Sequence, residues 1–155
     1  MVPFEIQTIN KAEAALQQVE AAIELFYVKK YAPSVTLAAA AEGCLARPTG
    51  GRSGELPVPE ALFEMMKRGA KERFGKTEKE AVARFNKVAY WLKHETLKEP
   101  TTIEITNYDA FSMIVRAITK IEATAPGSET PAISKFIEFS REHYGAIVRG
   151  VRPSL

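Results

Sequence analysis

Residues 31–45 read YAPSVTLAAAAEGCL, and this stretch predicts a central helix in a bundle of helices. Pro33 can occupy the first turn of a helix, because the N–H group that proline lacks would be unpaired there anyway. The residues that follow are rich in alanine and form almost no polar side, which is typical of a helix surrounded by others. Alanine side chains are short, so neighbouring helices can approach closely. We therefore expect an all-α fold with this helix near its middle.

Glu42 is the only charged residue in that apolar stretch. An unpaired carboxylate inside a protein is very costly, so Glu42 requires either a cationic partner or a place at an edge of the bundle. Glu42 is also kept as a candidate binding residue. Cys44 lies in the same alanine-rich helix, where a buried and inert thiol is expected.

The residues before this helix predict another one. Asn10 and Glu13 have the spacing of a capping box, in which each side chain accepts a hydrogen bond from the other residue's backbone. Apolar residues then recur at helical spacing, which predicts a helix to about Tyr31.

The residues after the alanine-rich helix predict a loop and two further helices. Residues 47–59 are rich in glycine and proline, so a flexible loop is expected there. One helix is expected from about Glu60 until Gly75 ends it. Thr77 and Glu80 have the spacing of a second capping box and predict a helix that extends to about residue 95.

The last third of the chain predicts an extended connector and two helices. In residues 101–106 isoleucines alternate with polar residues, but a lone strand has no partner, so we expect a connector. Asn107 is expected to cap the next helix. Its inward residues are expected to be Phe111, Ile114, Val115, Ile118 and Ile121. Pro131 can open the final helix, whose apolar side would be Ile133, Phe136, Ile137, Tyr144, Ile147 and Val148. Residues 150–155 are expected to be a frayed tail.

Length and composition favour one domain. The 155 residues fit a single bundle of five to six helices spanning residues 1–155, and 46% hydrophobic with 26% charged residues is average for a globular protein. A single cysteine allows no intramolecular disulfide and no thiolate zinc cage, which favours a cytoplasmic location. No stretch approaches 18 apolar residues and no targeting segment is recognised, so no membrane partner is expected. No metal and no cofactor are expected either.

Basic residues gather in one part of the chain. The net charge is only +2, but residues 67–93 contain nine basic and three acidic residues. Most such runs are solvated helix faces, and an anion-binding patch is the alternative.

The helix expected after Thr77 has two distinct sides. At 100° per residue one arc holds the residues that would anchor it in the bundle, which are Val82, Phe85, Val88, Ala89 and Leu92. The other arc holds the candidate binding residues Arg84, Lys87, Tyr90, Trp91, Lys93 and His94. Trp91 is the only tryptophan, and three alternatives account for it. The helix is packed on both sides, or the arc is a surface for self-association or a partner, or the arc binds a nucleic acid or nucleotide.

Two motifs resemble a known family. Residues 36–42 read TLAAAAE, shortly after Leu25-Phe26, and residues 91–94 read WLKH. Together they resemble a bacterial family of small uncharacterised all-helical proteins that is similar to HEPN-type bundles. The resemblance covers about two-thirds of the chain.

HEPN ribonucleases carry an arginine and a histidine on one helix at a dimer interface, with four to six residues between the two. The resemblance therefore implies His94 as general acid and base, with an upstream cation that stabilises phosphate. This sequence departs from the motif, because Lys87 stands seven residues before His94 and Arg84 stands ten before it. Lysine lacks the bidentate fork of arginine, which weakens phosphate clamping. Lys87 and His94 thus stay weak catalytic candidates.

We therefore expect a non-catalytic cytoplasmic helical protein that acts by self-association or partner binding through the helix of Trp91, with a homodimer as its expected state. The alternatives are an HEPN-like, metal-independent ribonuclease and a protein that binds RNA or a nucleotide.

Overall fold

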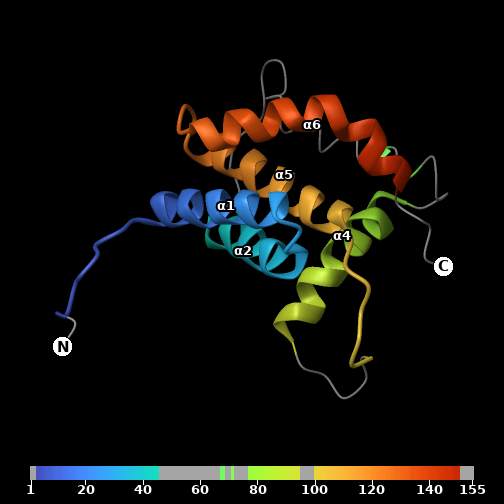
Figure 1. Cartoon of the computed structure of the whole chain (residues 1–155), viewed down its shortest axis with the longest axis horizontal. Helices are drawn as coiled ribbons and strands as arrows, with labels where there is room; N and C mark the ends of the chain where they lie inside the picture. Colours follow the sequence, from blue (N-terminus) through green and yellow to red (C-terminus); the bar gives the residue numbers. More distant parts are fainter. Residues whose placement is uncertain (1–2, 46–66, 69–70, 72–76, 95–99, 151–155) are drawn as a thin grey trace.

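The computed structural model describes residues 3–45, 67–68, 71, 77–94 and 100–150. Within them the chain forms five helices, drawn in Figure 1. These are α1 (Lys11–Tyr27), α2 (Tyr31–Cys44), α4 (Glu78–Lys93), α5 (Asn107–Thr124) and α6 (Pro131–Gly150). No strand occurs among the described residues, so the all-α prediction is confirmed. The loop predicted at 47–59 and residues 151–155 of the predicted tail lie outside the described residues. So does most of the helix expected from Glu60.

Helices α1, α2 and α5 pack on one another and form the centre of the core. Small side chains make this close packing possible, because Ala22 of α1 and Ala38 of α2 are completely buried. The buried Ser34 hydroxyl donates a hydrogen bond to the Ala22 carbonyl oxygen at 2.8 Å. Helix α2 is therefore a central helix, as its alanine-rich sequence predicts.

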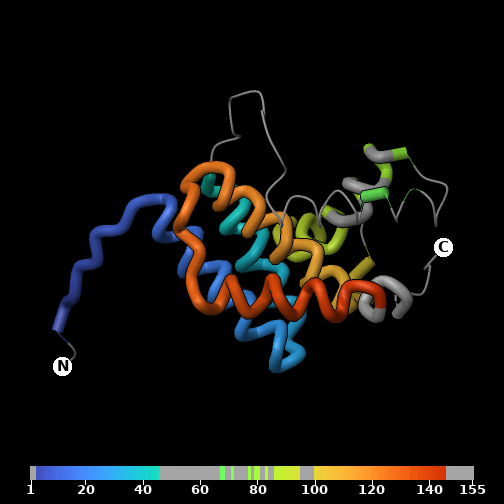
Figure 2. Tube along the Cα trace, turned by 90° about the horizontal axis from the view of Figure 1, so that it is seen from above, coloured from blue at the N-terminus to red at the C-terminus, as the bar shows by residue number. Residues whose placement is uncertain are grey.

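Helices α5 and α6 bring the large apolar side chains to this core. All five residues predicted to face inward on α5 are buried, namely Phe111, Ile114, Val115, Ile118 and Ile121. Helix α6 packs on α1 and α5, as Figure 2 shows from above. Its Phe136 ring is completely buried and meets Phe26 of α1 edge to face, with ring centroids 5.6 Å apart.

Several helix ends differ from the sequence-based prediction. Helix α1 ends at Tyr27 rather than near Tyr31, because Lys29 adopts a left-handed backbone with φ of 61°. The Lys30 N–H then donates to the Leu25 carbonyl oxygen at 2.9 Å, which closes the helix. Helix α6 extends to Gly150, which is the first residue of the predicted tail.

The cap of α5 is also displaced from its predicted residue. It is Thr106 rather than Asn107, because Thr106 and Asp109 make the reciprocal capping box. The two boxes predicted from sequence, at Asn10 and Thr77, are confirmed.

Glu42 holds three helices together. Its carboxylate on α2 receives a bidentate interaction from Arg116 of α5, with Nη2 to Oε1 and Oε2 distances of 2.8 and 2.9 Å. Arg116 also donates through Nη1 to the Asn86 side-chain oxygen of α4. Lys120 of α5 adds a bond from its Nζ to the Glu42 backbone oxygen at 2.6 Å. The predicted cationic partner of Glu42 is therefore Arg116.

The pair is largely withdrawn from water, so breaking it should be costly. The side chains of Arg116 and Glu42 are 12% and 23% exposed. We predict that Arg116→Met lowers the free energy of unfolding by about 2–3 kcal/mol, because the Glu42 carboxylate keeps its burial and loses its partner. Urea denaturation measures the change. The double variant Glu42→Leu/Arg116→Met is the control. Its free energy of unfolding should fall by less than that of Arg116→Met, because it leaves no unpaired charge. A double variant that is less stable than the single one would contradict this account.

Candidate functional site

Helix α4 is fixed at its start and along one side. At its start the Thr77 hydroxyl accepts from the Glu80 N–H, and the Glu80 carboxylate accepts from the Thr77 N–H at 2.8 Å. Along its inner side Val88 is buried, while Ala89 and Leu92 pack against the core. These three residues belong to the arc predicted to anchor the helix. The side chains of Val82 and Phe85, which complete that arc, lie outside the described residues.

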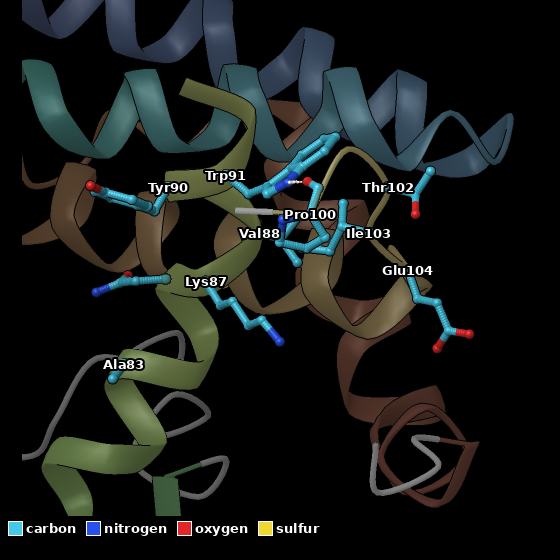
Figure 3. A pocket seen from close by; sticks show the side chains of 10 residues that line it. Ala83, Lys87, Val88, Tyr90, Trp91, Pro100, Thr102, Ile103 and Glu104 are labelled. Carbon is cyan, nitrogen blue, oxygen red and sulfur yellow. Dashed lines mark hydrogen bonds between the residues drawn. The ribbon is translucent and has the colours of Figure 1, made fainter. Parts of the chain in front are cut away.

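A groove opens between α4 and the extended connector that precedes α5. Figure 3 shows it from close by. The groove has a volume of about 590 Å³. We call it the Trp91 groove and define it by Lys87, Val88, Trp91, Pro100, Ile103 and Glu104. Its walls are mainly apolar, with the exposed Lys87 on α4 and the exposed Glu104 on the connector.

Trp91 ties the two walls of this groove together. Its indole Nε1–H donates to the Pro100 carbonyl oxygen at 2.9 Å, the bond dashed in Figure 3. The side chain is partly buried. Trp91 therefore lines an open groove. Its side chain is neither fully buried nor projecting freely from the helix.

A second groove lies on another side of α4, against α2. It also has a volume of about 590 Å³, and we call it the His94 groove. From α4 it is lined by Tyr90, Lys93 and His94, and from α2 by Thr36, Ala40 and Gly43. The rings of Tyr90 and His94 lie with centroids 4.5 Å apart at an interplanar angle of 37°. Tyr90 is 50% exposed and points away from Trp91 in Figure 3.

The predicted site residues therefore divide between two places. Lys87 and Trp91 line the Trp91 groove, whereas Lys93 and His94 line the His94 groove. Tyr90 borders both. The side chain of Arg84 lies outside those that the structure describes, and Glu42 serves the ion pair with Arg116.

Two contributors to these grooves were not recognised in the sequence. The connector supplies Pro100 and Ile103, and a signal was present, because the alternation in residues 101–106 implies one side that faces the protein. Asn86 lines both grooves and binds Arg116, but a lone asparagine on a helix carries no signal of that kind.

Comparisons with protein-family models, with curated proteins and with solved structures found no match. The resemblance to a helical family similar to HEPN bundles therefore stays a prediction from the sequence. Within the described part of the chain, no helix is long and apolar enough to cross a membrane, and no group of three or more His, Cys, Asp or Glu residues could hold a metal ion.

The bond between Trp91 and Pro100 gives a prediction about the stability of the groove. Trp91→Phe keeps an aromatic ring but removes the indole N–H, so it should lower the free energy of unfolding by about 1 kcal/mol, as measured by urea denaturation. Tyr90→Phe is the matched control. The Tyr90 side chain is half exposed, and among the described residues no hydrogen bond to its hydroxyl occurs. Removal of this hydroxyl should therefore change the free energy of unfolding by less than about 0.5 kcal/mol. Equal losses in the two variants would argue against a structural role of the bond.

Proposed function

We propose that this protein acts by binding a protein partner through helix α4, and that the partner is a second copy of the same chain. The observation that carries the proposal is the position of Trp91 in an open, mainly apolar groove. Tryptophan and tyrosine are enriched among residues that dominate binding energy, because they combine a large apolar area with a hydrogen-bonding group. Trp91 and Tyr90 each supply a large apolar ring and a hydrogen-bonding group, at neighbouring positions of α4.

The packing of α4 supports the same proposal. The buried Val88 and the partly buried Leu92 suffice to anchor α4, so the exposed ring of Tyr90 is not needed for the fold. The Trp91 bond to Pro100 fixes the ring before any partner arrives, and a pre-ordered side chain loses little conformational entropy on binding. The exposed Lys87 and Glu104 give this groove the polar rim that protein interfaces commonly have.

We predict that Trp91→Ala combined with Lys87→Glu converts a dimer into a monomer. The change removes the apolar anchor and reverses a charge on the rim of the same groove. Light scattering coupled to size exclusion measures the mass, and circular dichroism verifies that helicity is retained. The control is Lys135→Glu, which reverses an exposed charge on α6. A double variant of unchanged dimeric mass would refute the assignment of this surface.

RNA or a nucleotide is the second candidate ligand. It is favoured by the His94 groove, where the half-exposed Tyr90 ring lies against His94 and close to Lys93 in sequence. Bases stack on exposed aromatic rings, and lysine neutralises phosphate. An HEPN-like ribonuclease would in addition require His94 to move a proton while an upstream cation holds phosphate. Lys87 lines the other groove, so one substrate would have to contact both sides of α4.

The RNA alternative makes its own prediction. Binding of a short single-stranded RNA, followed by fluorescence anisotropy, should weaken as salt rises, because neutralised phosphates release counterions. Tyr90→Ala should weaken binding at least tenfold, whereas Lys135→Ala on α6 should not. If the purified protein also cleaves the RNA, His94→Ala should abolish cleavage. An affinity for RNA that does not fall with salt and is unchanged by Tyr90→Ala would eliminate this alternative.

A further inference from the structure

The N-terminal segment carries apolar side chains that its own chain does not cover. Residues 3–10 precede α1 without regular structure and project away from the helices in both Figures 1 and 2. We call residues 3–9 the arm. Phe4 and Ile6 are 90% and 80% exposed. In an extended chain residues two apart share a face, so Phe4 and Ile6 form one apolar face of the arm.

The connector beside the Trp91 groove offers a matching edge. Residues 101–105 are without helix, and within the described structure none of their backbone N–H or C=O groups pairs with another backbone group. The arm likewise has no backbone pairing among the described residues. Extended segments with free edges readily add a strand from another chain, and a neighbouring groove then receives alternate side chains of that strand.

We propose that the arm of a second copy pairs with the connector and inserts Phe4 and Ile6 into the Trp91 groove. This inference rests on the proposed function, because it names the segment that occupies the groove. The occupant comes from another copy, because the arm leaves the end of α1 that is far from α4 and points away from α4 (Figure 1). Two copies that exchange arms make the same contact twice, which closes the assembly as a dimer.

The size of the groove suits this occupant. A cavity of about 150 Å³ holds benzene, so a groove of about 590 Å³ has room for a phenyl ring and a second apolar side chain. Burial of one phenylalanine removes about 150–250 Å² from water. Two reciprocal arms, each with a phenylalanine, an isoleucine and a short backbone ladder, bury on the order of 1,200 Å², the lower limit for a specific interface.

Cross-linking between two differently labelled chains tests the contact directly. Both chains carry Cys44→Ser, which removes the only native cysteine. One chain then carries Gln7→Cys on the arm, and the other carries Thr102→Cys on the connector. After mixing, a short bismaleimide should give a covalent dimer at a yield at least tenfold above a control in which Lys135→Cys of α6 replaces Thr102→Cys. A yield equal to the control would overturn the proposal.

The same pair of cysteines in one chain locates the source of the arm. Cross-linking in dilute solution that leaves the mass at one chain would place the arm in its own groove and overturn the second-copy assignment. Doubled mass supports the exchange.

A variant of the arm separates this inference from the proposed function. Phe4→Ser/Ile6→Ser should raise the dimer dissociation constant at least tenfold, whereas the control Gln7→Ser should not. If the arm variant stays dimeric while Trp91→Ala/Lys87→Glu is monomeric, the arm inference fails and the function of α4 stands. If the wild-type chain is a monomer at every concentration, both fail.

Discussion

The ion pair between Glu42 and Arg116 is the contact on which the arrangement of the helices depends. It joins α2 to α5, and through Asn86 it also fixes α4. A partly buried carboxylate without such a partner would be very costly, so the alanine-rich helix can carry Glu42 only where α5 presents Arg116. Asn86 lines both grooves. The hydrogen bonds that join Glu42, Arg116 and Asn86 therefore also position α4 between α2 and the connector.

Because α4 is held in this way, it offers grooves on two sides. Val88 and Leu92 face the core, the Trp91 groove opens toward the connector, and the His94 groove opens toward α2. Both grooves are mainly apolar, but they differ in their polar side chains. The first has Lys87 and Glu104 on its rim and suits an apolar side chain of a partner, whereas the second combines the Tyr90 and His94 rings with Lys93 and suits a base and a phosphate. The two functions proposed for the protein therefore correspond to different sides of one helix.

Much of the fold follows from local patterns in the sequence. The capping boxes at Asn10 and Thr77 and the apolar period of α5 were sufficient to predict those helices, because both signals act within a few residues. The partner of Glu42 could be predicted as a cation but not as Arg116, which lies 74 residues away along the chain. The connector wall of the Trp91 groove depends on tertiary packing in the same way. The sequence also did not predict that Lys87 and His94 line different grooves. A helical wheel gives the positions of residues around one helix and contains no information on the helices and connectors that pack against it.

The central claim is that α4 meets a second copy at Trp91, and the only tryptophan of the chain reports on that contact directly. The measurement is the emission maximum of Trp91 on dilution from high micromolar to low nanomolar concentration, with molecular mass followed by light scattering or mass photometry. We predict that emission moves to longer wavelength over the range in which the dimer dissociates, because the indole then meets water. A dimer that dissociates with no change in emission would place the interface elsewhere and contradict this account.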